Sequence, residues 1–434
     1  MQAVIMAGGK GTRLASLTRN EIPKPMALLL GKPLLLWQME ALKRNGITEI
    51  ILVTGHLGYV IEDFFEDGGA FGLHIQYFRE EKPLGTAGAL THLRPMLEET
   101  FFLLYGDVLF DIDLRRMERF HREKRAAATL FVHPNAHPFD SDLVETDLEQ
   151  RVLRFDSKHN VRDYWYENCV NAGLYLLDRR ICEDLPNQEK IDLEKDLLMG
   201  LCQEAGAIYA YRSPEYIKDI GTVDRIQAAE ADLKSGSVAA RNLQKPQRAI
   251  FLDRDGTINV KRGLISSPES FELEPCAVEA IREINRSGYL AIVITNQPAV
   301  ARGLCGVENI KEIHRKMQTL LGREGVFLDA VRFCPHHPDK GYPEENPAYK
   351  ISCRCRKPDI GMLEDCAEQY HIDLSASWFV GDTTVDIQTG KNAGTRTALV
   401  LTGDAGSDRK YDGKPDLICK HVLEAVEQIL RREC

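Results

Sequence analysis

Short apolar runs alternate with longer amphipathic stretches along the first half of the chain. Two of the longer stretches, 32–45 and 115–124, repeat their apolar positions at the spacing of a helix. The short runs have the residue types that favour strands. Strands are expected at 2–6, 49–54, 74–78, 101–105 and 127–132. Strands that alternate with helices are typical of βαβ units, so this half predicts an α/β fold around a mostly parallel sheet.

The same pattern begins again in the second half of the chain. Segment 234–247 lies between the halves, is polar, and contains glycine and proline, so we interpret it as a linker. The sequence therefore predicts two Rossmann-like α/β domains, 1–233 and 248–434. In the second domain, strands are expected at 248–253, 290–295, 377–380 and 397–401, and helices at 277–287 and 360–370.

The composition fits a globular protein with two cores. The chain has 434 residues, of which 44% are hydrophobic and 28% charged. A net charge of −10 argues against a nucleic-acid partner. We find no secretory leader and no apolar run near the ~20 residues that span a bilayer, so we expect a cytoplasmic protein without a membrane partner. The 11 cysteines are odd in number, which disfavours a disulfide framework.

A glycine-rich loop, AGGKGTRL at 7–14, follows the first predicted strand. Its glycines allow backbone amides to approach a phosphate chain closely, because no side chain stands in the way. Arg13 adds a guanidinium that can bind phosphate with two hydrogen bonds. Taken alone, the loop is equally well explained by a tight strand-to-helix turn.

Further elements follow the loop in order. Lys24 lies between two prolines that stiffen its backbone, which suits a contact with phosphates. Segment 83–90, PLGTAGAL, offers small residues to a flat base and its ribose. Asp107 ends an apolar strand and Asp219 ends another short one. Carboxylates at the ends of sheet strands are common magnesium ligands.

This ordered set resembles the sugar-1-phosphate nucleotidylyltransferase family over residues 1–233. The resemblance implies that a sugar phosphate attacks the α-phosphorus of a nucleoside triphosphate and that pyrophosphate leaves. It implies catalytic roles for Arg13 and Lys24, magnesium binding by Asp107 and Asp219, and a tendency to form homo-oligomers. The implied nucleotide contacts are Gly8, Gly9, Gly11, Thr12, Arg13, Thr86 and Gly88.

The sugar side of this predicted site departs from the family pattern. Asn171, in the segment VNAGLY, is the implied sugar contact. Many members of the family have a Glu-Lys-Pro element where this chain has FDSKH at 155–159. Lys158 is therefore one candidate for binding the sugar phosphate, and the run Glu194-Lys195-Asp196, in the segment LEKD, is another. A solvated charge run explains Lys195 equally well.

The second half places two carboxylates, Asp253 and Asp255, directly after an apolar strand. A polar turn would explain this pair by itself. Three further signals follow: TNQ at 295–297, RKP at 356–358 and GDTTVD at 381–386. Together they resemble the haloacid dehalogenase phosphatases over residues 248–433.

By this resemblance Asp253 attacks phosphorus and forms a phospho-aspartate, and Asp255 acts first as general acid and then as general base. Magnesium is implied at Asp253, Asp382 and the backbone carbonyl of Asp255, with Asp386 in support. The implied contacts to the substrate phosphates are Thr295, Asn296, Arg302, Arg356 and Lys357. Ordinary surface salt bridges would also account for the two arginines.

Cysteine and histidine gather in an insert of the second half. Cys334 and His336 form one close pair, and Cys353 and Cys355 form another. Thiolate and imidazole ligands at this spacing suit tetrahedral zinc without an open position, and hence a structural site. His337 is a rival to His336, and coincidental buried thiols are the alternative explanation.

The insert also resembles that of the D,D-heptose 1,7-bisphosphate phosphatases and the histidinol phosphatases, which have little cap domain. The first half is most similar to heptose 1-phosphate guanylyltransferases and the related mannose-1-phosphate enzymes. A bisphosphatase that leaves a sugar 1-phosphate would supply the transferase, so we expect two steps of GDP-heptose synthesis, using GTP and the α anomer of D-glycero-D-manno-heptose 1,7-bisphosphate. The alternative is a mannose or other hexose 1-phosphate transferase fused to a histidinol-type phosphatase.

Overall fold

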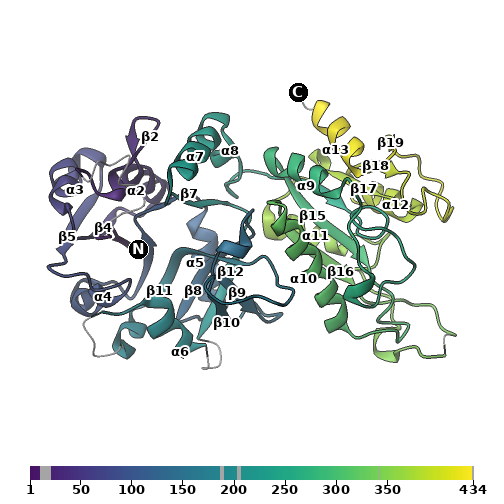
Figure 1. Cartoon of the computed structure of the whole chain (residues 1–434), viewed down its shortest axis with the longest axis horizontal. Helices are drawn as coiled ribbons and strands as arrows, with labels where there is room; N and C mark the ends of the chain where they lie inside the picture. Colours follow the sequence, from purple (N-terminus) through teal and green to yellow (C-terminus); the bar gives the residue numbers. More distant parts are fainter. Residues whose placement is uncertain (10–20, 186–189, 203–206, 342, 433–434) are drawn as a thin grey trace. The chain divides into compact units, whose positions relative to one another are not determined.

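The computed structural model describes residues 1–9, 21–185, 190–202, 207–341 and 343–432. Its contacts divide the chain into two compact units, which Figure 1 colours from purple to yellow along the sequence. The first unit comprises Met1–His133, Asp142–Ser157 and Val170–Asn242. The second comprises Pro134–Ser141, Lys158–Cys169 and Leu243–Cys434. Two short segments of the sequence's first half therefore group with the second unit.

The segment that the sequence predicts as a linker, 234–247, has structure of its own. It contains the end of α7 (Val223–Ser235) and all of α8 (Ser237–Ala240). Just after α8, the Asn242 side chain donates to Asp111 Oδ1 at 2.7 Å in the first unit. The backbone N–H of Gln247 donates to the carbonyl of His371 at 2.7 Å in the second unit. Each end of the segment is thus fastened to its own unit.

The first unit is built on one large sheet, which is mixed instead of mostly parallel. Strands β1, β4, β5 and β6 are parallel, as the sequence predicts, but β11 runs antiparallel to β6 and β8. Only a short turn joins β9 to β10, so no crossover helix can make that pair parallel. Across the sheet the strands are β10 (Val152–Asp156), β9 (Leu143–Thr146), β11 (Val170–Asp178), β6 (Thr100–Tyr105), β1 (Gln2–Met6), β4 (Glu49–Thr54) and β5 (His74–Arg79), with β8 (Ala128–His133) beside β11 and β12 (Ile208–Arg212) beside β8.

Helices and short hairpins complete the first unit. The predicted helix 32–45 begins only at Leu34, because Lys32 and Pro33 form a short strand before it. Leu35, Met39 and Leu42 of that helix are buried in the core of the unit. The remaining elements are α2 (Leu34–Arg44), α3 (Gly58–Phe65), α4 (Gly88–Leu93), α5 (Leu114–Lys124) and α6 (Met199–Leu201), and the strand pairs β2 (Leu28–Leu29) with β3 (Lys32–Pro33) and β7 (Val108–Asp111) with β13 (Tyr216–Asp219).

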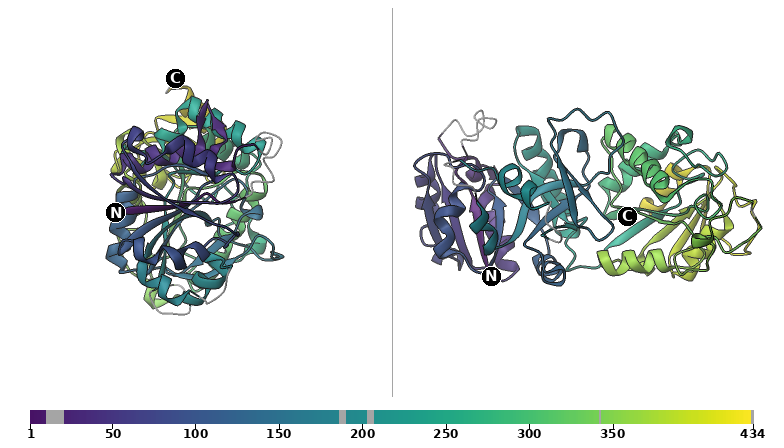
Figure 2. Two further views of the ribbon diagram at one scale, coloured as in Figure 1. Left: turned by 90° about the vertical axis from the view of Figure 1, so that its left-hand side faces the viewer. Right: turned by 90° about the horizontal axis from the view of Figure 1, so that it is seen from below.

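The second unit has a six-stranded sheet in which every pair is parallel. In the right-hand view of Figure 2 its green and yellow strands run side by side. The order is β16 (Ala330–Cys334), β15 (Tyr289–Asn296), β14 (Arg248–Leu252), β17 (Trp378–Gly381), β18 (Arg396–Val400) and β19 (Leu417–Cys419). The chain starts at β14 and builds outward in both directions, so a topological switch point lies between β14 and β17.

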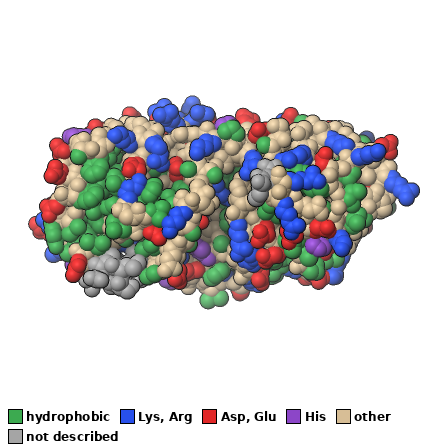
Figure 3. Space-filling model, turned by 90° about the horizontal axis from the view of Figure 1, so that it is seen from above, with side chains coloured by type: hydrophobic (Ala, Val, Ile, Leu, Met, Phe, Trp, Pro, Cys, Tyr) green, Lys and Arg blue, Asp and Glu red, His purple; other side chains and the backbone are tan. Residues whose placement is uncertain are grey.

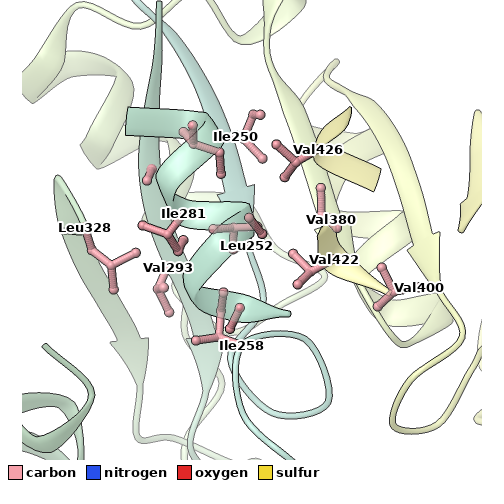
Figure 4. Close-up of a cluster of buried hydrophobic side chains, with 14 of the residues drawn as sticks. Ile250, Leu252, Ile258, Ile281, Val293, Leu328, Val380, Val400, Val422 and Val426 are labelled. Atoms are coloured by element: carbon pink, nitrogen blue, oxygen red, sulfur yellow. The ribbon is translucent and has the colours of Figure 1, made fainter. Parts of the chain in front are cut away.

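Helices bury the sheet of the second unit on both faces. Figure 4 shows Ile281 of α9 and Val426 of α13 packed with strand residues such as Ile250, Val293 and Val380 in one core. A second core includes α11. The helices are α9 (Ala277–Arg286), α10 (Val307–Arg323), α11 (Gly361–Tyr370), α12 (Thr384–Asn392) and α13 (Val422–Arg431).

Surface and helix composition add two observations. Within the described residues, no helix has both the length and the apolar character needed to cross a bilayer. On the face drawn in Figure 3, basic and acidic side chains are interspersed.

Candidate functional site

The first unit contains a cavity of about 450 Å³ at the carboxyl ends of its parallel strands. Met6–Gly9 lie at the end of β1, and Tyr105–Asp107 lie at the end of β6. Because β1 and β6 are neighbouring parallel strands, their ends lie close together at the cavity. Gly11, Thr12 and Arg13, which the sequence predicts to bind nucleotide, lie outside the described residues. The residues that line the cavity are Met6, Ala7, Gly8, Gly9, Lys24, Pro25, Glu80, Pro83, Gly85, Thr86, Tyr105, Gly106, Asp107, Lys190 and Gly221.

A lysine and two carboxylates meet at one end of this cavity. Lys24 Nζ donates to Asp107 Oδ2 and lies 3.7 Å from Asp219 Oδ1. The other oxygen of Asp219, Oδ2, accepts a hydrogen bond from Arg225. Asp219 Oδ1 is buried and has no hydrogen-bond partner. Two convergent carboxylates with an unshared oxygen fit a divalent cation, so Asp107 and Asp219 could hold magnesium there.

The PLGTAGAL loop is fixed against segment 191–193. Thr86 Oγ1 accepts a hydrogen bond from Leu193 N at 2.7 Å. Gly85 has φ +85°, and a Cβ there would lie 2.3 Å from the Ile191 carbonyl oxygen, so only glycine fits. Gly88 begins α4 and is buried. Thr86 therefore lines the cavity, whereas Gly88 supports it from behind.

Glu80 is a cavity residue that the sequence reasoning missed. Its Oε1 accepts a hydrogen bond from Leu84 N at 3.3 Å. Its Oε2 lies so close to Gly8 that a Cβ on that glycine would approach it to 2.6 Å. Burial raises the pKa of the Glu80 carboxyl. A desolvated acceptor thus stands beside the phosphate loop, and its position three residues before Pro83 was the available signal.

Asn171 belongs to a buried polar cluster centred on Glu194. Asn171 Nδ2 donates to Tyr175 Oη at 2.8 Å and to Glu194 Oε1 at 3.4 Å. Tyr105 Oη and Tyr175 Oη both donate to that same Oε1. Burial raises the pKa of Glu194, and the two tyrosines oppose the rise. The sequence predicted Asn171 as a sugar contact, whereas it marked Glu194 only as part of the charged run 194–196.

The two lysines predicted to bind the sugar phosphate lie in different units. Lys195 is exposed, in a π-helix at Leu193–Leu198 that also carries Glu194. Lys158 is exposed and belongs to segment 158–169, which groups with the second unit. Lys158 is not among the residues that line the cavity, and its contact with the sugar phosphate stays a prediction. Lys190 lines the cavity instead, and no motif in the sequence marked it.

In the second unit, the predicted nucleophile lies at the switch point of the sheet. Asp253 follows β14 and Asp382 follows β17, which pair side by side. Lys357 Nζ donates to Asp253 Oδ1 and to Asp386 Oδ1, each at 2.6 Å. All four side chains are buried. Burial alone would lower the pKa of Lys357, but Asp253 and Asp386 raise it above its usual value.

The same carboxylates fit a metal ion. Oxygens of Asp253, Asp382 and Asp386 all lie within 4.8 Å of one another. Asp382 Oδ2 accepts from Asp404 N at 2.7 Å, whereas its Oδ1 is buried without a partner. Gly256, at φ +84°, leaves room for this carboxylate, because a Cβ there would lie 2.5 Å from Asp382 Oδ2. The donor set is all oxygen and suits magnesium.

The carboxylate of Asp255 is directed away from that cluster. It accepts hydrogen bonds from Arg254 Nη2 at 2.9 Å, from Gln297 Nε2 at 2.8 Å and from Asn259 Nδ2 at 3.1 Å. Burial alone would raise its pKa, but the Arg254 guanidinium holds that pKa below its usual value. Because these three donors occupy the side-chain oxygens of Asp255, its backbone carbonyl is the group left to a metal.

The TNQ segment links the phosphate-binding groups. Gln297 Nε2 donates to Thr295 Oγ1 at 2.9 Å as well as to Asp255. Asn296 Nδ2 donates to the carbonyl of Lys357 at 3.1 Å, and Lys357 N donates back to Asn296 Oδ1 at 3.1 Å. Asn296 therefore positions Lys357, a function that the spacing of the two motifs did not indicate.

The four predicted zinc ligands come together. Cys355 Sγ lies 3.1 Å from Cys334 Sγ and from Cys353 Sγ, and His336 Nδ1 lies 3.4 Å from Cys355 Sγ. All four ligand atoms lie within 4.8 Å of one another, which fits tetrahedral zinc. The rival His337 is outside this group, and its Nδ1 accepts from Asp339 N at 3.1 Å.

The two arginines predicted for a distal phosphate lie near His337. Burial, together with the charges of Arg356 and Arg302, lowers the pKa of His337 to about 4. Arg356 Nη1 also donates to the His336 carbonyl at 2.9 Å. The zinc loop therefore carries a concentration of positive charge beside the metal cluster.

Comparisons with known proteins follow the division of the chain. The nucleotidyl transferase family model matches residues 2–236, and a HAD-hydrolase-like model matches residues 354–425. A mannose-1-phosphate guanylyltransferase of Mycobacterium tuberculosis is 35% identical over 258 residues, which are 59% of this chain and 70% of that protein. A D-glycero-beta-D-manno-heptose-1,7-bisphosphate 7-phosphatase of Photorhabdus laumondii is 41% identical over 157 residues, which are 36% of this chain and 81% of that protein. The solved structure of HddC from Yersinia pseudotuberculosis with GMP-PN is 26% identical, covers 54% of this chain and 99% of its own, and has a TM-score of 0.47.

Proposed function

Because the chain belongs to the nucleotidyl transferase family and its second unit to the HAD-like phosphatases, we propose that it catalyses two consecutive steps of GDP-heptose synthesis. The second unit removes the 7-phosphate of D-glycero-D-manno-heptose 1,7-bisphosphate. The first unit transfers GMP from GTP to the resulting heptose 1-phosphate and releases pyrophosphate. One observation carries this proposal: each unit has its own lysine held between two carboxylates, Lys24 in the first and Lys357 in the second.

In the phosphatase unit, Asp253 attacks the phosphorus of the 7-phosphate, and the bond from phosphorus to the sugar oxygen breaks. Asp255 gives its proton to that departing oxygen, and then takes a proton from the water that hydrolyses the phospho-aspartate. Lys357 and Thr295 bind the phosphoryl oxygens, and Asn296 keeps Lys357 in place. Magnesium, when bound by Asp253, Asp382 and the Asp255 carbonyl, supplies positive charge that offsets the repulsion between nucleophile and phosphate.

In the transferase unit, an oxygen of the sugar phosphate attacks the α-phosphorus of the nucleotide, and pyrophosphate departs. The sugar phosphate is already an anion near neutral pH, so no general base is needed. Lys24 neutralises charge on the α-phosphate region, and Asn171 with Glu194 orients the sugar hydroxyls. Magnesium, when bound by Asp107 and Asp219, supplies further charge neutralisation for the phosphate chain.

Guanine as the base is supported by Glu80. A carboxylate accepts hydrogen bonds only, and guanine offers two adjacent donors, N1–H and the 2-amino group, whereas adenine offers a donor beside an acceptor. Glu80 lines the cavity next to Gly8 and presents such a carboxylate. Two transferases similar to this chain differ in base: the one from Mycobacterium tuberculosis is named a guanylyltransferase, and one from Synechocystis, 33% identical over 260 residues, is named a uridylyltransferase. Glu80→Gln should therefore lower the preference for GTP over ATP by about tenfold.

The identity of the phosphate that leaves follows from how the two units depend on each other. Removal of the 1-phosphate would leave the transferase without a substrate, whereas removal of the 7-phosphate supplies it. We assign the α anomer because the chain joins this phosphatase to a guanylyl-type transferase. The phosphatase relatives carry the β anomer in their names, so both anomers belong in the test.

The remaining parts of the proposal concern metals and setting. We assign zinc to Cys334, His336, Cys353 and Cys355 as a structural ion, since the protein supplies four ligands and leaves no open position. Magnesium serves both active sites. We place the protein in the cytoplasm, where its nucleotide substrate is made, and expect a homo-oligomer through the transferase unit.

A phosphorus NMR time course tests the function directly. The full chain would receive magnesium, GTP or ATP, and each anomer of the heptose bisphosphate in turn. We expect free phosphate first, then pyrophosphate together with a nucleotide-sugar diphosphate, and only with GTP. Phosphate release without nucleotide sugar would reject the assigned sugar or base of the transferase. No release from either anomer would reject the heptose assignment in favour of a hexose transferase joined to a histidinol-type phosphatase.

A further inference from the structure

A buried histidine outside every sequence motif lies behind the phosphatase site. His314 is in the middle of α10, and its side chain is almost fully buried. The edge of its ring packs against Phe333 of β16, with the ring centroids 5.2 Å apart. Its Nε2 lies 3.2 Å from Nη1 of Arg254. The ring is therefore held in one orientation with one nitrogen directed at a guanidinium.

Arg254 joins this histidine to the proposed general acid. The arginine has no solvent exposure, although it lies between Asp253 and Asp255 in sequence. Its Nη1 contacts His314, while its Nη2 donates to both oxygens of Asp255 at 2.9 Å and its Nε lies 3.3 Å from Asp255 Oδ1. Because the guanidinium is planar, a contact that fixes one nitrogen also fixes the direction of the others.

The hydrogen-bond directions define the state of the histidine. Arginine only donates, so Nε2 of His314 must accept, and the ring is neutral with its proton on Nδ1. Burial and the charge of Arg254 lower the pKa of His314 well below its usual value, which agrees with a neutral ring. Without this acceptor, Nη1 of a fully buried arginine would lose a partner, a loss that favours rotation of the guanidinium.

We propose that His314 is a positioning residue of the phosphatase: it fixes Arg254, and Arg254 in turn holds the Asp255 carboxyl in the direction of the departing sugar oxygen. The proposal rests on the general-acid role assigned to Asp255 in the proposed function. Gln297 and Asn259 contact Asp255 as well, but each is an uncharged donor. The buried charge of Arg254 makes its contact the strongest of the three, so misdirecting Arg254 should misdirect the acid.

The test uses the dependence of the rate on the leaving group. An alkoxide of a sugar departs only when it receives a proton, whereas 4-nitrophenolate departs readily without one. We would measure kcat/KM of the full chain for the heptose bisphosphate and for 4-nitrophenyl phosphate, since kcat/KM reports formation of the phospho-aspartate. For His314→Leu we expect a decrease of about 10–100-fold with the sugar phosphate and less than about threefold with the aryl phosphate.

Two conservative variants and one neighbour serve as matched controls. His314→Gln places an amide oxygen near the position of Nε2 and should restore most of the sugar phosphate rate. His314→Asn places its oxygen nearer to the position of Nδ1 and should not, so this pair decides the question even when His314→Leu does not fold. Met317→Leu, buried on the same helix, should leave the ratio between the two substrates unchanged.

Each outcome has a defined meaning. Equal losses with both substrates, or equal rates for His314→Gln and His314→Asn, would overturn the positioning role and leave His314 a packing residue. If the unaltered protein hydrolysed neither substrate, the proposed phosphatase function itself would fail. Nucleotidyl transfer, measured on the same samples, should remain within about twofold of the unaltered protein, because the altered residues lie in the second unit.

Discussion

The two active sites use similar groups in different surroundings. Lys357 has 3% of its side chain exposed, and its partners Asp253 and Asp386 have 10% and 1%. Lys24 has 11% exposed, but its partners Asp107 and Asp219 have 31% and 42%. The phosphatase centre is thus preassembled in a dry environment, whereas the transferase centre borders an open cavity. Charges interact more strongly where water is excluded, so the first arrangement tolerates less change.

The difference follows from the substrates and from the two sheets. A phosphoryl group is small, and the switch point of a fully parallel sheet brings the ends of β14 and β17 close around it. A nucleotide with a sugar phosphate is much larger and needs a cavity of several hundred cubic ångströms, such as the one of about 450 Å³ in the first unit. Loops that follow several strands, together with Lys190, form its walls.

The largest effect should come from removing the phosphatase nucleophile. Asp253→Asn keeps the size of the side chain but cannot form a phospho-aspartate, so phosphate release should fall by at least about 10⁴-fold. Nucleotidyl transfer to heptose 1-phosphate should be unchanged in the same sample. Malachite-green and pyrophosphate assays measure the two activities, and loss of both in a folded variant would break the picture of two independent sites.

The open site should respond less to loss of its lysine. Lys24→Met removes the cation that neutralises the phosphates, and we expect kcat of nucleotidyl transfer to fall by about 10²–10³-fold. Phosphate release should remain as it was. Lys24→Arg, which keeps the charge, should recover part of the rate; a rate for Lys24→Met within threefold of the unaltered protein would show that other cations hold the phosphates.

Removing the proposed zinc ion should lower the thermal stability of the second unit but not that of the first. We expect a zinc chelator, or Cys355→Ser, to lower the temperature at which phosphatase activity is lost by more than about 5 °C, because bound zinc stabilises only the folded loop. The midpoint for loss of transferase activity should not move. The check is residual activity of each kind after heating, with zinc content measured by atomic absorption.

The smallest predicted effect is on how stability depends on pH, and each unit contributes to it through a buried histidine. Burial lowers the pKa of His121 in the first unit to about 4, so the folded state keeps this ring neutral while the unfolded chain takes up a proton below about pH 6.5. A lowered pKa of this kind stabilises the fold above pH 6.5, and the stabilisation is lost as the pH falls toward 4. His121→Gln should therefore lose about 1–3 kcal/mol less of its free energy of unfolding than the unaltered protein over this pH range.

Thermal unfolding of the two proteins between pH 7.5 and pH 5 checks this prediction. The unaltered protein should lose more stability than His121→Gln as the pH falls. His314, whose pKa is also lowered by burial, should act in the same direction in the second unit. Parallel curves for the variant and the unaltered protein would mean that His121 takes up its proton equally in the folded and unfolded states.

Much of the fold follows from local patterns in the sequence. Runs such as 2–6 and 49–54 form strands within the predicted bounds, because they alternate with helical periods and are edged by turn residues. The sequence did not predict that the first sheet is mixed. The antiparallel pairing of β11 depends on the connections of the chain and not on the composition of β11 itself. A strand's direction is a property of its neighbours.

The site residues also fall into those that the sequence predicted and those that only the structure revealed. The sequence predicted Asp107, Asp253 and the Cys and His residues of the zinc loop as site residues, because their proposed chemistry requires fixed residue types at fixed spacings. Glu80 and His314 were not predicted, and Glu194 was marked only as part of a charged run, because the contacts that distinguish them are with residues distant in sequence: Gly8, Arg254 and Tyr175, respectively. The sequence also gave no sign that the segment carrying Lys158 groups with the second unit, since an exposed lysine carries no signal of where its segment packs.

By itself, then, the sequence determined the kinds of chemistry available to this protein, through carboxylates, lysines and thiolates at motif spacings. The tertiary structure alone decided which of these groups share a dry environment, which face an open cavity, and which are held by a distant partner. The physical reason is that desolvation and hydrogen-bond direction depend on atoms brought together by folding, and residues far apart in the chain supply most of them.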